Sequence, residues 1–148
     1  PGAQHDGRGW RIRVIPNKYP AVNVGAQSPS AASTQPQPHE LFQQASADGV
    51  HEVIIESPRH VTTAGELNDA ETAEVLHVYQ ARLRTLRGEA SERGLQYVQI
   101  FRNVGEAAGA SIEHLHSQLI GLPSVPPLIA DELQSATRHF VHTGKCPW

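Results

Sequence analysis

The residues best suited to chemistry lie in one short run, from Gly109 to Gln118. In this run His114, His116 and Gln118 occupy every second position. Because alternate residues of a strand project from the same face, we expect these three side chains to line one surface. The preceding residues are Gly, Ala and Ser, whose backbone N–H groups can bind an anion. An imidazole beside such a loop is suited to nucleophilic attack on a phosphate, although a bare His-x-His pair is also compatible with a structural or surface role.

The composition favours a globular protein of one domain. The chain has 148 residues, which is enough to bury a core. Its net charge of −3 gives no electrostatic preference for nucleic acid or for anionic membranes. No apolar run approaches the ~20 residues that span a bilayer, and no signal-peptide pattern is found at the start. We therefore expect a cytoplasmic protein without nucleic-acid or membrane partners.

Hydrophobic periodicity and turn residues predict the order strand, strand, helix, strand, strand, helix. The expected strands are residues 10–15, 51–56, 95–103 and 114–122, and the second helix is residues 129–141. The first helix is capped by Asn68 or Asp69 and ends by Gly94. Its expected apolar face consists of Val75, Leu76, Tyr79, Leu83 and Leu86. This order predicts an α+β domain, in which helices pack on one face of an antiparallel sheet.

Residues 25–38 differ in composition from the rest of the chain. They are Gly, Ala, Gln, Ser, Thr and Pro, with almost no large apolar side chains. Such a segment buries too little apolar surface to fold on its own. We expect a flexible low-complexity loop, with a lid over the site as the alternative.

Three stretches of the chain resemble the galactose-1-phosphate uridylyltransferases, a branch of the histidine-triad superfamily. Residues 97–123 resemble the family motif Phe-x-Asn-x-Gly-x-x-x-Gly-x-Ser-x-x-His-x-His-x-Gln. The matching positions here are Phe101, Asn103, Gly105, Gly109, Ser111, His114, His116 and Gln118. Residues 13–21 and 51–60 agree as well, so the resemblance covers most of residues 10–123. It implies that residues 1–148 form a single histidine-triad-like domain.

The resemblance implies a nucleotidyltransferase that moves UMP or AMP between sugar 1-phosphates through a nucleotidyl-histidine intermediate. It assigns the nucleophile to His116, and we expect a nearby carbonyl to hold the other ring nitrogen of this residue. Gln118 stands where other histidine-triad branches carry a third histidine. An amide donates a hydrogen bond to a phosphoryl oxygen but is a poor general acid, which favours transfer from a nucleotide sugar. A plain surface position on the strand is the alternative for Gln118.

The resemblance also places Asn17, Asn103, Gly105, Gly109 and Ser111 at the substrate. Asn103 and Ser111 match family positions that contact phosphate, and the two glycines would let the backbone come close. Asn17 matches a family residue near the nucleotide. Taken alone, the glycines are turn residues and Asn17 is a cap of the turn that follows it.

A structural zinc ion is implied by the resemblance, with His60 and His114 as two of its ligands. The family completes this site with a Cys-x-x-Cys pair, whereas Cys146 is the only cysteine here. Tetrahedral zinc takes four ligands. We therefore expect zinc in the full-length protein and an incomplete site in this chain. Four further histidines are assigned structural or surface positions: His51, His77, His139 and His142.

Three departures from the best-known family members indicate a divergent branch, and one of them is the Ile112-Glu113 pair before His114. Arg102 stands where those members carry Glu, and a cation there is a candidate phosphate contact or a determinant of substrate choice. Leu115 separates the two histidines, where those members carry Pro. The base and the acceptor therefore stay open. The alternatives are a histidine-triad hydrolase or phosphorylase of nucleotide sugars such as ADP-glucose, and a non-catalytic nucleotide-binding half.

The ends of the chain suggest a longer protein. The sequence contains no methionine, and Cys146 looks like the first part of a second Cys-x-x-Cys pattern. We expect this chain to be the first half of a two-half protein, with a complete small protein as the alternative. Because the family builds its active site from two halves or subunits, we expect a homodimer or pairing with a second half-domain.

Overall fold

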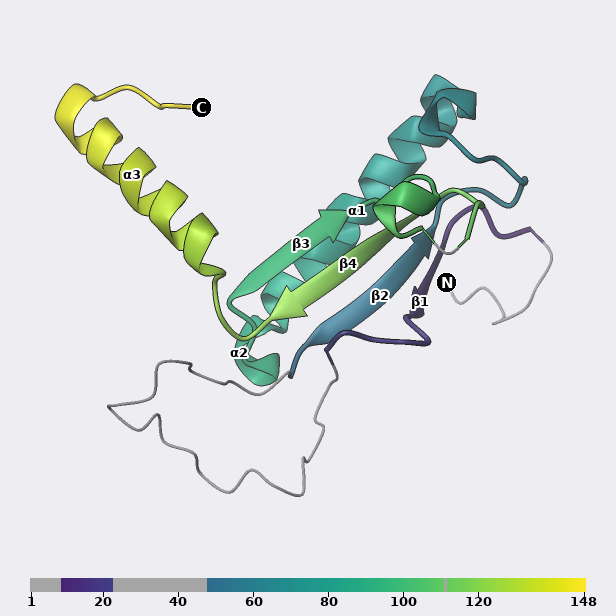
Figure 1. Ribbon diagram of the computed structural model, residues 1–148, viewed down its shortest axis with the longest axis horizontal. Helices are drawn as coiled ribbons and strands as arrows, with labels where there is room; N and C mark the ends of the chain where they lie inside the picture. Colours follow the sequence, from purple (N-terminus) through teal and green to yellow (C-terminus); the bar gives the residue numbers. More distant parts are fainter. Residues whose placement is uncertain (1–8, 23–47, 111) are drawn as a thin grey trace, which may run out of the picture.

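The computed structural model describes residues 9–22, 48–110 and 112–148 (Figure 1). The loop predicted at 25–38 and the candidate residue Ser111 lie outside the described residues. Within these ranges the strands are β1 (Arg13–Pro16), β2 (Val50–Ile55), β3 (Tyr97–Phe101) and β4 (His116–Leu122). They form one antiparallel sheet in the order β1-β2-β4-β3. The predicted α+β class, the antiparallel sheet and the pairing of the last two strands are confirmed.

Helix α1 (Asp69–Gly88) lies along one face of the sheet (Figure 1). It begins at the predicted cap, where the Asn68 side chain accepts the backbone N–H of Glu71 at 3.0 Å. The Glu71 carboxylate returns a bond to the backbone N–H of Asn68 at 2.9 Å, which completes a capping box. The short helix α2 (Ala90–Arg93) follows, and Gly94 ends it in the left-handed conformation with φ 66°.

The core lies between α1 and the sheet. Its buried cluster consists of Val50, Ile54, Leu86, Leu95 and Leu119. The side chain of Tyr79 packs against this cluster from α1.

The predicted apolar face of α1 is wrong at two positions. Leu76 is 57% exposed and Leu83 is 39% exposed. Val78, which was not predicted, packs against the core instead. Of the α1 residues only Val75 and Leu86 are buried, so the covered side of the helix is narrower than the spacing predicts.

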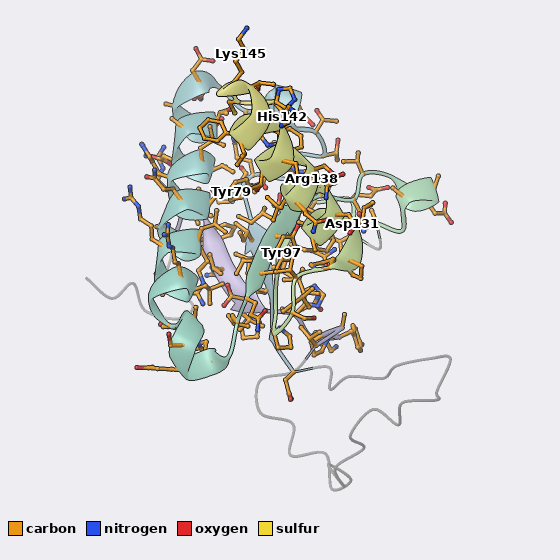
Figure 2. The ribbon with its side chains drawn as sticks, turned by 90° about the vertical axis from the view of Figure 1, so that its left-hand side faces the viewer. Tyr79, Tyr97, Asp131, Arg138, His142 and Lys145 are labelled. Carbon is orange, nitrogen blue, oxygen red and sulfur yellow. The ribbon has the colours of Figure 1, made fainter. Side chains whose placement is uncertain are left out.

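Helix α3 (Pro127–Thr143) extends the predicted helix by two residues at each end. Proline is suited to the first turn, where its missing N–H has no partner to lose. None of the α3 residues is buried, and the helix leads away from the sheet (Figure 1). Asp131, Arg138 and His142 follow one another along it (Figure 2). No helix in the described part of the chain is long and apolar enough to cross a lipid bilayer.

The remaining described elements are two short 3-10 turns. Turn η1 (Ala64–Glu66) precedes α1, and turn η2 (Glu106–Ala108) lies between β3 and β4. Turn η2 therefore forms part of the connection that leads to the predicted chemical residues.

Strand alternation gives the sheet two different faces. On β4, Ser117, Leu119 and Gly121 are buried on the side of α1. His116 and Gln118, which alternate with them, project from the opposite face. Among the described residues, neither α1, α2 nor α3 packs across that opposite face at β4 (Figure 1), so the predicted chemical side chains are accessible.

Candidate active site on the open face of the sheet

A cleft of about 710 Å³ lies on the face of the sheet opposite α1. Five of the predicted site residues line it together: Asn17, Gly109, His114, His116 and Gln118. Apolar side chains, including those of Ile15, Val53 and Ile55, form the rest of the strand surface. A concave, mostly apolar site with a few convergent polar groups is typical of small-ligand binding.

His116 is the first residue of β4, and the main chain fixes its imidazole. Nδ1 lies 2.8 Å from the carbonyl oxygen of His114. A carbonyl only accepts hydrogen bonds, so Nδ1 carries the hydrogen and donates it. Nε2 consequently keeps its lone pair, which is the state that a nucleophilic imidazole requires. The expectation that a carbonyl sets the tautomer of His116 is confirmed.

Backbone hydrogen bonds hold the segment that leads into His116. The N–H of Leu115 donates to the carbonyl of Val61 at 2.7 Å. The carbonyl of Leu115 accepts the N–H of Glu56 at 3.3 Å. The Leu115 side chain is buried, with 3% exposed. The histidine that follows therefore enters β4 from an anchored main chain, and its ring direction is defined.

His114 lies just before β4 and contacts the second predicted zinc ligand. Its Nε2 donates to the carbonyl of Ser57 at 2.8 Å. Its ring meets that of His60 edge to face, with the ring centroids 5.5 Å apart. With Nε2 bound in this way, Nδ1 is the nitrogen of His114 that remains available to a metal ion. The structure thus brings the two predicted ligands together.

The described residues do not complete a zinc site. Nowhere among them are three or more His, Cys, Asp or Glu side chains grouped so that they could hold a metal ion. Cys146 is exposed. A tetrahedral site needs four donors, and His60 with His114 supplies two. The residues present therefore fit at most half of such a site.

Gln118 lies in a hydrogen-bond network with two residues from the β1 side of the sheet. Its Oε1 lies 2.8 Å from Nε2 of His51 and 3.3 Å from Nδ2 of Asn17. Asn17 also accepts the N–H of Tyr19 through Oδ1 at 2.9 Å. Asn17 is therefore both the cap of its turn and a residue of the cleft, so its two predicted roles are compatible.

His51 is a polar residue of the cleft that the sequence analysis did not assign to the site. The sequence analysis assigned it a structural or surface position, yet it lines the cleft and contacts Gln118. Its spacing from Val53 and Ile55 places all three on one face of β2. This alternation along β2 identifies His51 as a site residue only when β2 is known to lie next to β4.

The connection between β3 and β4 contains the two predicted glycines. Gly105 and Gly109 flank η2 with φ of 78° and 79°. Such angles favour glycine, so both positions serve as turn residues. Asn103, Gly105 and His116 also line a small pocket of about 20 Å³, which is room for about one water molecule.

Arg102 lies in a buried polar cluster on the α1 side of the sheet. Its guanidinium forms an ion pair with Glu56. It also lies 3.3 Å from the Ser117 hydroxyl and 3.3 Å from the Tyr79 hydroxyl. Glu56 is 2% exposed and accepts hydrogen bonds from both hydroxyls. The charge of Arg102 is paired with this carboxylate, and Arg102 also lines the small pocket that contains Asn103 and His116; its predicted phosphate contact stays a prediction.

This cluster changes the acidity of two of its members. Burial raises the pKa of Tyr79, and the hydrogen bond to Glu56 raises it further. Burial alone would lower the pKa of Arg102, but the interactions with Glu56 and Tyr79 together outweigh burial and raise the pKa above its ordinary value. Tyr79 is therefore a neutral phenol and Arg102 a cation at neutral pH.

The sequence of this chain also matches a known protein family. Residues 10–126 match the family model described as galactose-1-phosphate uridyl transferase, N-terminal domain. The chain belongs to this family. The resemblance seen in the sequence is thereby confirmed, and most of the described elements lie within the matched range.

Similar proteins of this family carry two different names. An ADP-glucose phosphorylase of Arabidopsis thaliana is 35% identical over 137 residues, which are 93% of this chain and 37% of that protein. A galactose-1-phosphate uridylyltransferase of Haemophilus influenzae is 34% identical over 131 residues, which are 88% of this chain and 35% of that protein. The chain thus spans little more than a third of the length of these curated relatives.

Solved structures support the fold. A crystal structure of an ADP-glucose phosphorylase from Arabidopsis thaliana with bound ADP-glucose superposes with a TM-score of 0.76 at 32% identity. The superposition covers 96% of this chain and 41% of that chain. A uridylyltransferase structure gives a TM-score of 0.75 at 32% identity, and the match covers 99% of this chain and 44% of that chain.

Proposed function

We propose that this chain forms the nucleotidyl-transfer centre of an enzyme that acts on nucleoside diphosphate sugars. The observation that carries the proposal is the 2.8 Å contact between Nδ1 of His116 and the carbonyl oxygen of His114, in which Nδ1 must be the donor. Nε2 is left as a neutral nucleophile on a residue that lines the cleft. Membership of the galactose-1-phosphate uridyl transferase family supports the same chemistry.

The proposed reaction has two displacement steps. In the first, Nε2 of His116 attacks the α-phosphorus, a P–N bond forms, and the bond from this phosphorus to the bridging oxygen breaks. The sugar 1-phosphate leaves with that electron pair and needs little protonation. In the second step, a phosphate oxygen of the acceptor attacks the same phosphorus, and His116 departs with its lone pair restored. One cleft therefore serves both substrates in turn.

Polar residues around His116 are proposed to bind the reacting phosphate and the nucleotide. The Gln118 amide would donate to a non-bridging oxygen as negative charge develops. Asn17, Asn103, Ser111 and the turn from Gly105 to Gly109 are the further substrate-binding candidates. The apolar strand surface of the cleft would accept the less polar parts of the nucleotide.

The donor and the acceptor define two candidate reactions. The first is transfer of UMP or AMP to a sugar 1-phosphate, as the uridylyltransferase relatives suggest. The second is phosphorolysis of a nucleotide sugar such as ADP-glucose. It is favoured by the relative named ADP-glucose phosphorylase, which matches 93% of this chain. Both reactions share the first step at His116.

The proposal also includes a structural zinc ion, an assembly of two copies or two halves, and a location in the cell. His60 and His114 would supply two ligands of a structural zinc ion, with the other two from outside the described residues. We further propose a homodimer or pairing with a second half-domain, and a cytoplasmic location. Zinc analysis of the full-length gene product and of a His60→Ala variant tests the metal site, because loss of one ligand should lower the zinc content.

Intact-protein mass spectrometry tests the proposed reaction. The full-length gene product is incubated with UDP-glucose or with ADP-glucose, beside His116→Ala and the exposed-histidine control His77→Ala. We expect a gain of one nucleotidyl group in the wild type and the control, and none in His116→Ala. The donor that reacts identifies the base. Adding a sugar 1-phosphate or inorganic phosphate to the adduct then identifies the acceptor.

Two results would overturn the proposal. No mass gain with either donor would show that the cleft does not carry out nucleotidyl transfer. A gain that persists in His116→Ala would place the nucleophile on another residue.

A further inference from the structure

A line of hydrogen bonds connects the main chain after β1 with the side chain of Gln118. The backbone N–H of Ala21 lies 2.9 Å from Nδ1 of His51. Nε2 of the same ring lies 2.8 Å from Oε1 of Gln118. His51 is the middle member of this line.

The direction of each bond in the line follows from its first donor. A backbone N–H can only donate, so Nδ1 of His51 is an acceptor and carries no hydrogen. In a neutral imidazole the hydrogen then lies on Nε2, which donates to Oε1 of Gln118 at 2.8 Å. Nδ2 of Asn17 also lies 3.2 Å from this Nε2, but both atoms are donors in this state, so Nδ2 of Asn17 donates to Gln118 and not to His51. The tautomer of His51 is therefore opposite to that of His116, in which Nδ1 carries the hydrogen.

The same reasoning fixes the orientation of the Gln118 amide. Oε1 accepts from His51, and it also accepts from the Asn17 amide at 3.3 Å. The Asn17 amide is itself oriented, because its Oδ1 accepts the N–H of Tyr19 at 2.9 Å. If the Gln118 amide were flipped, its NH₂ group would face two other donors, Nε2–H of His51 and the NH₂ group of Asn17. None of these three donors would then have an acceptor in the network. The network therefore selects one of the two amide orientations.

We propose that His51 is a positioning residue for Gln118, which holds the amide with its oxygen toward β2 and its NH₂ group toward the substrate. The proposal rests on the proposed function, because the substrate group in question is the α-phosphate transferred by His116. Within the described residues the Gln118 NH₂ group makes no hydrogen bond to protein. It is a donor available to a phosphoryl oxygen, on the strand face that also carries His116.

The loss of His51 should affect the reaction through Gln118 alone. Without His51, the amide keeps only the longer contact with Asn17 and can turn its oxygen toward the phosphate, where it would repel the negative charge. The expected result is a fall of about 5- to 10-fold in the rate of adduct formation, the effect of one intramolecular hydrogen bond. Affinity for the nucleotide sugar should change less than this rate.

A double-mutant cycle on the full-length gene product tests the proposal. His51→Leu removes the donor and introduces an apolar side chain of similar size, whereas His51→Gln retains an N–H donor. We expect His51→Leu to slow adduct formation, His51→Gln to restore most of the rate, and the control His77→Leu to have no effect. In a Gln118→Ala background, His51→Leu should cause no further loss, because the group it orients is gone.

NMR of the same proteins keeps the test independent of turnover. Long-range ¹H–¹⁵N spectra should show His51 with hydrogen on Nε2 and His116 with hydrogen on Nδ1. His51→Leu should shift or broaden the side-chain amide resonances of Gln118. An absent adduct in the wild type would refute the proposed function, and these spectra would still decide the role of His51.

Three results would overturn the inference. Additive effects of His51→Leu and Gln118→Ala would show that His51 does not act through Gln118. Equal rates for His51→Leu and His51→Gln would show that its donor is irrelevant. A His51 tautomer with hydrogen on Nδ1, or Gln118 amide resonances unchanged in His51→Leu, would contradict the geometry.

Discussion

Replacing Glu56 by glutamine removes a buried charge with almost no change in side-chain size. The Glu56 side chain is 0% exposed and forms an ion pair with Arg102, whose side chain is 27% exposed. It also accepts the hydroxyls of Tyr79 and Ser117. These partners come from α1, from β4 and from the residue that follows β3. One carboxylate therefore joins three separate segments on the α1 side of the sheet, opposite the cleft.

The cost of Glu56→Gln follows from what its partners can do. A hydroxyl can accept as well as donate, so Tyr79 or Ser117 can bond to the new NH₂ group. Arg102 can only donate, so it keeps the glutamine oxygen and loses the opposite charge. Breaking a buried pair from one side costs ~3–5 kcal/mol. Because Arg102 is partly solvated, we expect the free energy of unfolding to fall by about 2–3 kcal/mol.

Urea unfolding followed by circular dichroism measures this effect. The matched control is Glu52→Gln on β2, since Glu52 forms an ion pair with a single residue, Arg82, and is 13% exposed. We expect that change to cost about 1 kcal/mol. The reasoning would be refuted if Glu56→Gln lowered the free energy of unfolding by less than about 1 kcal/mol. It would also be refuted if Glu56→Gln lowered this free energy by no more than Glu52→Gln does.

Further predictions concern the helix cap, the buried phenol and a close backbone approach. Asn68→Ala removes the acceptor of the Glu71 N–H and should lower stability by about 1 kcal/mol in the same urea assay. Tyr79 has a pKa raised above its ordinary 10.0, so the folded state holds this proton more tightly than the unfolded state. The resulting stability is complete below pH 10.0 and is lost as the pH rises through the raised pKa, so Tyr79→Phe should flatten the alkaline slope of stability. A Cβ at Gly49 would lie 2.2 Å from the carbonyl oxygen of Gly121, so Gly49→Ala should cost about 1–3 kcal/mol and lower the melting temperature.

Each of these changes has a control in the same chain. Asn68→Ser keeps a capping oxygen and should stay within about 0.5 kcal/mol of the wild type. Tyr19→Phe alters a tyrosine that is 79% exposed and should leave the alkaline slope unchanged. Gly88→Ala adds a Cβ with no atom within 4 Å and should not destabilise the protein. Indistinguishable behaviour of any variant and its control would contradict the corresponding contact.

Features of the fold that depend on neighbours in sequence were predictable. The cap at Asn68 requires only the residues of one helical turn, and Gly94 ends a helix through its own backbone freedom. The common face of His116 and Gln118 follows from the alternation of a single strand. Local geometry determines each of these features, so composition and spacing were sufficient.

Features that depend on strand order were not predictable from spacing. His51 reaches Gln118 because β4 lies between β2 and β3, a pairing that joins residues far apart in the chain. The same order brings Arg102 to Glu56 beneath the sheet instead of to the cleft. Leu76 also appeared apolar and inward, but only the position of α1 on the sheet decides which side of the helix is covered. In each case a long-range contact outweighs the local pattern.

Successive side chains of β4 project alternately into the core and into the cleft. Positions 117, 119 and 121 lie in the core beneath α1, whereas positions 116 and 118 lie in the cleft. A substitution at position 116 or 118 therefore changes the cleft without removing a side chain from the core. The residues at positions 116 and 118 can therefore vary while positions 117, 119 and 121 stay the same. We expect directed evolution at the two cleft positions to lower the free energy of unfolding only slightly.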